Sequence, residues 1–126
     1  MTSRLTEWVI DSRDPERLAE FWCAVLDYHV VSRDGGEVEI AGLPGAPSIL
    51  FEWARDEKLH KNRVHLDLNA VGVDQETELQ RLLDLGATHV DIGQGEQTWV
   101  VLADPEGNEF CLLRSTVQAE PAPLRD

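Results

Sequence analysis

The sequence has little that would hold it in a membrane or cross-link it. Its 126 residues include two cysteines, one methionine and one tyrosine, and no apolar run is long enough for a membrane-spanning helix or a signal peptide. Cys23 and Cys111 lie in unlike contexts, so they form neither a CxxC pair nor a disulfide framework. We therefore expect a soluble cytoplasmic protein with reduced thiols, built as one domain or as two small units that share a core.

Basic residues are also scarce, with 11 Lys and Arg against 24 Asp and Glu and a formal net charge of −13. Binding to nucleic acid needs clustered Lys and Arg, so this balance argues against a nucleic-acid partner. The stretch KLHKNR at 58–63 is locally basic and is either a solvated loop or part of a substrate-binding rim. The segment 116–126 has two prolines and no periodicity, which predicts a flexible C-terminal tail.

The first half of the chain predicts a strand, a helix and three further strands. A β-prone run at 7–10 is followed by Asp14 as a helix N-cap and Pro15 at the first helical position. An apolar stripe at helical spacing comes next, made of Leu18, Phe21, Trp22, Val25 and Leu26. Turn-forming residues then separate three predicted strands, at 29–32, 37–41 and 48–53.

The second half repeats this order. Asp74 is a predicted N-cap and Gly86 a predicted helix end, and Leu79 follows Leu18 at an offset of 61 residues. Strands are predicted at 64–68, 88–92, 98–103 and 109–114. Such a repeat indicates two copies of one unit. The predicted fold class is therefore α+β, with two βαβββ modules in tandem at about 5–54 and 62–115 whose curved sheets form one cleft.

Three motifs in the chain resemble those of the vicinal oxygen chelate superfamily, which includes glyoxalase I, the bleomycin resistance proteins and the extradiol dioxygenases. The motifs are DPERLAEFW at 14–22, KNRVHLDL at 61–68 and DPEGNEFC at 104–111. Together they look most like the glyoxalase-like subgroup. The resemblance implies one glyoxalase-like domain over 1–115, a small-molecule ligand in the cleft, and a homodimer.

Metal-dependent members of this superfamily bind one divalent ion through four side chains, from the first and last strands of each module. The resemblance places Glu7 and His65 in the two first-strand slots. It places Cys111 where relatives carry glutamate, and the repeat offset places Ile49 in the matching slot of module one, unless a register shift turns Glu52 inward instead. Because neither is a typical ligand there, a metal-free cleft is favoured over a divalent ion held by Glu7 and His65. Strict glyoxalase I activity is correspondingly disfavoured.

Each of these residues also has a second interpretation. Glu7 and His65 are ligands, or a catalytic acid and base, or else a solvated carboxylate and a hydrogen-bonded cleft histidine. Asp67 follows His65 by two residues on the same strand face, so it either orients that histidine or contacts water. Cys111 is an inert buried thiol or, beside His65, a nucleophile that contacts the substrate.

Besides Asp67 and Cys111, four further residues are predicted to contact a substrate. Trp53 and Trp99 can line a cleft for a flat apolar ligand, and Arg63, together with Lys61, can hold a substrate carboxylate at the rim. Two functions stay open. The first is a lyase, isomerase or dioxygenase-like enzyme that acts on a small oxygenated substrate. The second is a non-catalytic protein that binds an aromatic molecule or an antibiotic, as bleomycin resistance proteins do.

Overall fold

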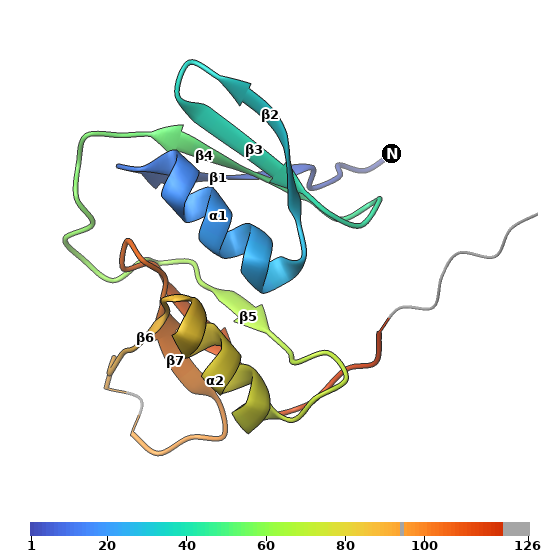
Figure 1. The fold of residues 1–126 in the computed structure, drawn as a ribbon, viewed down its shortest axis with the longest axis vertical. Helices are drawn as coiled ribbons and strands as arrows, with labels where there is room; N and C mark the ends of the chain where they lie inside the picture. Colours follow the sequence, from blue (N-terminus) through green and yellow to red (C-terminus); the bar gives the residue numbers. More distant parts are fainter. Residues whose placement is uncertain (94, 120–126) are drawn as a thin grey trace, which may run out of the picture.

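The computed structural model describes residues 1–93 and 95–119, which form two modules of the same topology (Figure 1). Module one contains β1 (Glu7–Ser12), α1 (Pro15–Leu26), β2 (His29–Asp34), β3 (Glu37–Ala41) and β4 (Ser48–Trp53). Module two contains β5 (Leu66–Leu68), α2 (Gln75–Leu85), β6 (Thr88–His89), β7 (Val100–Ala103) and β8 (Glu109–Leu112). The predicted α+β fold of two tandem βαβββ modules is confirmed.

Each module has one mixed four-stranded sheet. The strand orders are β1-β4-β3-β2 and β5-β8-β7-β6, and the first strand of each module runs parallel to the last. The remaining neighbours are antiparallel. First and last strands are therefore direct neighbours in each sheet, which brings together the segments that carry the candidate ligands.

Both helices begin where the sequence predicts. The Asp14 carboxylate accepts a hydrogen bond from the backbone amide of Arg17 at 3.2 Å, and Asp74 accepts one from Thr77 at 2.8 Å. These bonds satisfy amides that have no partner within the first helical turn. The second helix ends at Gly86, whose φ of 118° lies in the left-handed region that favours glycine.

The strand boundaries differ from the predicted ones in both modules. In module one, β1 and β2 each run two residues further than predicted. In module two, the strands are shorter than the predicted 64–68, 88–92, 98–103 and 109–114. The extent of pairing differs in the same way, because β1 pairs with all of β4 over six residues whereas β5 pairs with β8 over three.

An aromatic contact in the core joins the modules. Trp22 on α1 is 1% exposed and meets Phe21 edge-on, with ring centroids 5.2 Å apart. It also meets Phe110 on β8, with ring centroids 5.1 Å apart. Aromatic pairs in this geometry contribute beyond the area that they bury. The helix of module one is thus packed against the last strand of module two.

A buried carboxylate in the turn before β8 makes a second contact between the modules. Asp104 accepts hydrogen bonds from the backbone amides of Glu106 at 2.9 Å and Asn108 at 3.0 Å, and from Asn108 Nδ2 at 2.9 Å. A further hydrogen bond comes from module one, where the indole Nε1 of Trp22 donates to Asp104 Oδ2 at 3.0 Å. Burial raises the pKa of the Asp104 carboxyl, and the hydrogen bonds oppose this rise without cancelling it.

The same turn also binds the beginning of α1. The Glu106 carboxylate accepts hydrogen bonds from the Ser12 hydroxyl, from the Arg13 amide at 2.8 Å and from the Asp14 amide at 3.3 Å. Ser12 is buried although it is polar, so this partner replaces the water that it loses. The turn at 104–108 therefore holds the end of β1 and the start of α1 in place.

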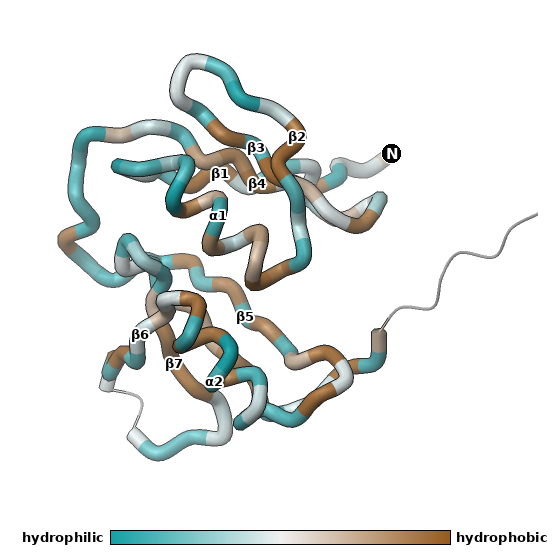
Figure 2. Tube along the Cα trace, in the orientation of Figure 1, coloured by the Kyte–Doolittle hydropathy of each residue, from teal (hydrophilic) through white to brown (hydrophobic). Residues whose placement is uncertain are grey.

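The linker 54–65 runs along one side of the molecule and is mostly hydrophilic (Figures 1 and 2). The predicted tail at 116–126 is described only as far as 119. There Thr116 Oγ1 donates to the Val73 carbonyl at 2.7 Å, and the Val117 amide donates to the Ala70 carbonyl at 2.9 Å. No helix in the described ranges has the length and apolar content needed to cross a membrane.

Replacing Trp22 with phenylalanine keeps an aromatic ring in the core but removes the N–H group that donates to Asp104. We expect the free energy of unfolding to fall by about 1 to 3 kcal/mol, because a buried acceptor loses a partner. Urea unfolding at neutral pH measures this loss. Trp53→Phe is the matched control, since Trp53 is 56% exposed and its variant should stay within about 0.5 kcal/mol of the parent. Equal losses in both variants would contradict a stabilising role for this bond.

Candidate functional site

A cleft with a volume of about 1170 Å³ lies between the modules. Its walls are formed by the end of β1, the start of α1, the linker 54–65 and the segment 105–110. Small-molecule sites typically have volumes of roughly 300 to 1,000 Å³. The cleft is therefore large enough for a small organic ligand.

An ion pair between the half-buried Lys58 and the buried Glu109 anchors the linker to the last strand. Lys58 Nζ lies 2.6 Å from Glu109 Oε2, and the Asn62 amide donates to Glu109 Oε1 at 2.8 Å. Burial raises the pKa of the Glu109 carboxyl, but the Lys58 ammonium and the Asn62 amide lower it by more, so its net pKa lies below the ordinary value. The basic stretch 58–63 is thus a wall of the cleft.

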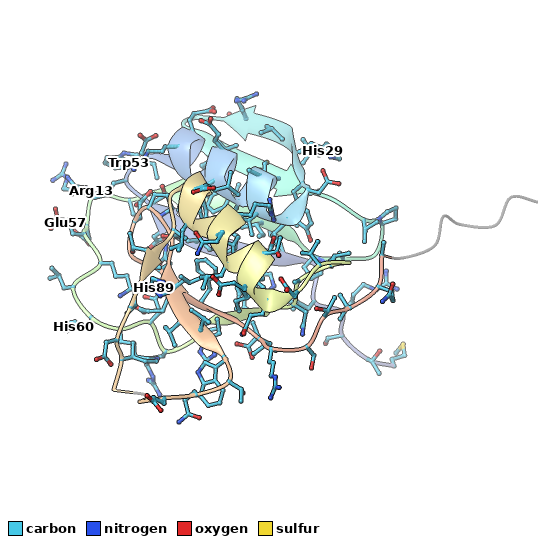
Figure 3. All side chains as sticks on the ribbon, turned by 60° about the horizontal axis from the view of Figure 1, so that its bottom comes forward. Arg13, His29, Trp53, Glu57, His60 and His89 are labelled. Atoms are coloured by element: carbon cyan, nitrogen blue, oxygen red, sulfur yellow. The ribbon has the colours of Figure 1, made fainter. Side chains whose placement is uncertain are left out.

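A second ion pair joins the linker to module one. Arg13 Nη1 contacts Glu57 Oε1, and Figure 3 shows both side chains at the edge of the molecule, with His60 further along the linker. Both side chains are exposed, so the pair contributes little to stability. It nevertheless connects the start of α1 to the linker at the cleft.

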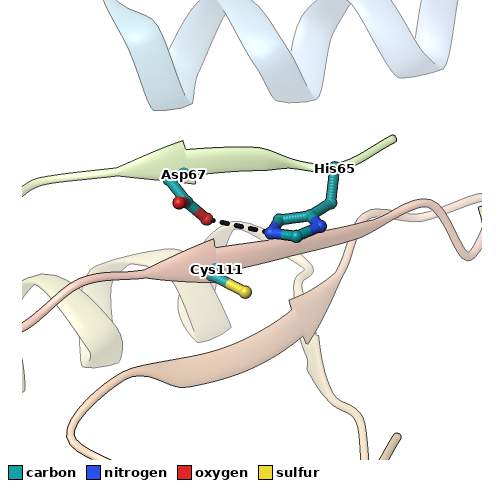
Figure 4. A group of neighbouring side chains, drawn as sticks. All are labelled: His65, Asp67 and Cys111. Atoms are coloured by element: carbon teal, nitrogen blue, oxygen red, sulfur yellow. Dashed lines mark ion pairs between the residues drawn. The ribbon is translucent and has the colours of Figure 1, made fainter. Parts of the chain in front are cut away.

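Three side chains gather beside the cleft in module two, namely His65, Asp67 and Cys111 (Figure 4). His65 Nε2 lies 3.2 Å from Asp67 Oδ1, and the ligand atoms of all three residues lie within 4.8 Å of one another. Asp67 on β5 is paired in register with Cys111 on β8. Of the three, His65 lines the cleft, whereas Asp67 and Cys111 are not part of its walls. Within residues 1–93 and 95–119 it is the one group of at least three His, Cys, Asp or Glu side chains with metal-ligand spacing.

The thiol of Cys111 is buried beside a carboxylate. Burial raises its pKa, and the charge of Asp67 and a hydrogen bond with it raise that pKa further. Lys61 acts in the opposite direction without cancelling these effects. The cysteine is therefore a protonated thiol at neutral pH, which argues against the interpretation as a thiolate nucleophile. Burial also raises the pKa of Cys23, which packs against the core.

The other predicted site residues are placed in different surroundings. Arg63 lines the cleft beside His65. Glu7 is exposed at the start of β1 and belongs neither to the three-residue cluster nor to the cleft walls formed by the described residues. Trp53 and Trp99 are 56% and 38% exposed, and those walls do not include them either.

The last strand of module one presents a different residue from the one that the repeat offset selects. Ile49 is 4% exposed and packs in the core with Phe51. Because side chains alternate along a strand, Leu50 and Glu52 point to the opposite face of β4. The β4 residue that corresponds to Cys111 in strand pairing is therefore Leu50, which cannot coordinate a metal, and Glu52 shares its face, as in the alternative register.

Three residues of the cleft were not singled out by the sequence, namely Lys58, Glu106 and Glu109. Glu106 lies in the turn directly after Asp104 and Pro105, and Glu109 is the first residue after that turn; acids around a tight turn are a signal for backbone capping that the sequence does contain. Lys58 belongs to the basic stretch 58–63, but no signal in the sequence indicates its partner Glu109, which lies 51 residues away in the chain.

Paired βαβββ modules around one cleft define the fold of the vicinal oxygen chelate superfamily, which the resemblance predicted. Within it the chain belongs to the family described as the glyoxalase-like domain, whose model matches residues 7–113. No match is found among curated proteins.

Solved structures of similar fold come from the same superfamily. A glyoxalase/bleomycin resistance protein/dioxygenase family enzyme from Burkholderia phytofirmans PsJN is 19% identical, covers 87% of this chain and 97% of its own, and has a TM-score of 0.66. The fosfomycin resistance protein FosX from Mesorhizobium loti is 21% identical over 89% and 92%, with a TM-score of 0.66. A FosX mutant from Listeria monocytogenes in complex with Mn(II) and a dihydroxypropylphosphonic acid is 18% identical over 90% of each chain, with a TM-score of 0.65. At these identities the likeness shows the fold alone.

Replacing Glu109 with glutamine removes the charge that Lys58 and the Asn62 amide stabilise. Because the folded pKa of Glu109 is lowered, its contribution is present above the ordinary pKa and is lost as the pH falls through the lowered value. We expect Glu109→Gln to lower the free energy of unfolding by about 1 to 3 kcal/mol at pH 7. The difference in the free energy of unfolding between this variant and the parent should shrink as the pH falls below about 4.5.

Urea unfolding at several pH values measures this difference. Glu20→Gln is the matched control, because Glu20 is exposed on α1 and its variant should follow the parent at every pH. A gap between the Glu109 variant and the parent that stays constant with pH would contradict the lowered pKa.

Proposed function

We propose that this chain is a metal-assisted enzyme that acts on a small oxygenated substrate in the cleft, and that His65, Asp67 and Cys111 hold its divalent ion. The observation that carries the proposal is that the ligand atoms of these three side chains lie within 4.8 Å of one another. His65 also lines the cleft, which places this donor next to a substrate bound there. The ion would belong to module two alone, without the predicted ligand Glu7.

The donor atoms fit a borderline divalent ion. An imidazole nitrogen, a carboxylate oxygen and a thiolate sulfur suit Zn²⁺ or Co²⁺ better than a hard ion. Three protein ligands with one open position are the usual arrangement of a catalytic zinc site. The Cys111 thiol must lose its proton when it binds the ion. The Mn(II) complex of FosX supports the idea that this fold can hold a divalent ion.

A divalent ion at this position would supply a Lewis acid for a carbonyl or hydroxyl oxygen of the substrate. The residues of the chain position the donor atoms and bind the substrate. Before the ion binds, the 3.2 Å contact between His65 Nε2 and Asp67 Oδ1 holds these two donor side chains together, and Arg63 and Lys61 bring positive charge to the wall of the cleft beside them. The reaction itself stays unassigned, and the homodimer and the cytoplasmic location stay predictions.

The second candidate function is a non-catalytic protein that binds a small molecule. The size of the cleft and the apolar side chains in its walls, among them Trp8, Val64 and Leu66, favour it. This candidate predicts an aromatic ligand whose affinity is the same with and without a chelator. It also predicts the same affinity for His65→Ala as for the parent.

Cobalt titration tests the metal site without a substrate. We expect Co²⁺ to bind the metal-free protein with 1:1 stoichiometry and to give a near-ultraviolet charge-transfer band from thiolate to cobalt. Cys111→Ser should abolish that band, and His65→Ala and Asp67→Asn should each weaken binding at least about tenfold, since each removes one of three ligands.

The chain supplies its own control in the other cysteine. Cys23→Ser should keep both the band and the affinity, because Cys23 lies on α1 and is not part of the cluster. A parent protein without the band, or a band that Cys23→Ser removes, would overturn the proposed site.

A further inference from the structure

Charge is distributed unevenly between the cleft and the rest of the molecule. Five of the 11 Lys and Arg residues and six of the 24 Asp and Glu residues line the cleft. The rest of the chain therefore has six basic and 18 acidic residues. The cleft is close to neutral, whereas the remainder is strongly negative. Anionic ligands are repelled from most of the surface and least from the cleft.

Four of the six acidic residues in the cleft have protein partners, whereas no ion pair or side-chain hydrogen bond among the described residues engages the carboxylates of Asp11 and Asp56. Glu57 pairs with Arg13, and Glu109 pairs with Lys58. Glu106 accepts three hydrogen bonds from the segment 12–14. Two of the six negative charges are thus offset by Lys or Arg, and the carboxylates of Glu106 and Asp14 are satisfied by hydrogen bonds.

Three basic side chains in the cleft have no acidic partner among the described residues. Arg17 lies on the first turn of α1, and Lys61 and Arg63 lie on the linker beside His65. Lys61 Nζ donates only to the carbonyl of Asn62, at 3.1 Å. An arginine that is free of a carboxylate can bind an anionic group with two parallel hydrogen bonds.

Apolar side chains lie in the same walls. Trp8 is 37% exposed and Val64 is 62% exposed, and both line the cleft. Val9, Ile10, Leu59 and Leu66 add further apolar surface there. Exposed apolar side chains beside unpaired cations fit a ligand with an apolar body and an acidic group.

We propose that the cleft binds a small organic anion with an apolar body, whose acidic group contacts Arg17 and Arg63. The apolar body lies against Trp8 and Val64. This inference rests on the proposed function, since it names the class of substrate that would reach His65.

Two fluorescent probes that differ in one acidic group test this inference. 8-Anilinonaphthalene-1-sulfonate carries a sulfonate, and N-phenyl-1-naphthylamine has the same apolar body without it. Both are titrated against the 126-residue chain in the presence of EDTA, so that the result does not depend on a metal. Arg17→Gln and Arg63→Gln are compared with the parent and with Arg114→Gln, which makes the same charge change at an exposed residue outside the cleft.

We expect each cleft variant to bind the sulfonate probe about tenfold more weakly, the loss that one charge-assisted hydrogen bond gives. Arg114→Gln should bind both probes as the parent does, and the neutral probe should bind all variants equally. Unchanged affinity of the cleft variants for the sulfonate probe would overturn the inference. An equal loss of both probes would overturn it too. Either of these failures would leave the cobalt test of the metal site unaffected.

Discussion

The position of the cleft depends on the hydrogen bonds of one buried carboxylate, that of Asp104. An ionised carboxylate that leaves water must find hydrogen bonds to replace its hydration. Three of its hydrogen bonds come from its own turn, and the fourth comes from Trp22 in the other module. Asp104 is therefore fully bonded only when the modules are docked. Because Glu106 in the same turn binds the start of α1, docking also fixes the wall of the cleft at 105–110.

Features that depend on near neighbours in the chain could be predicted from the sequence. The caps Asp14 and Asp74 bond to amides three residues away, and both helix starts are confirmed. The repeat also gave the two modules. Contacts between distant segments could not be predicted, because no pattern in the chain states that Lys58 pairs with Glu109. The repeat offset selected Ile49 as the last-strand position of module one, although Ile49 lies in the core. A repeat offset counts residues through loops of unequal length, and an error of one residue turns a strand position to the other face.

In the candidate site, too, contacts between near neighbours in the chain could be predicted and contacts between distant segments could not. His65 and Asp67 could be paired from the sequence because residues two apart share a strand face. Their proximity to Cys111 follows from the parallel register of β5 and β8, which places Asp67 opposite Cys111. The resemblance spreads four ligands over both modules, whereas the donors that the structure brings together all come from module two. Glu7 is in register with Ser48 in the other sheet.

The two proposed sites therefore depend on different parts of the fold. The metal donors are set by the pairing of β5 with β8 and by the bend before β5, so they need only an intact second module. The anion site takes Arg17 from α1 and Arg63 from the linker, so it exists only when the modules are docked and the linker is held by Glu109. Loss of the bond between Trp22 and Asp104 should therefore act on the cleft walls before it acts on the metal donors. A substrate in the cleft would require both parts at once, because the docked walls would position it and module two would supply the chemistry.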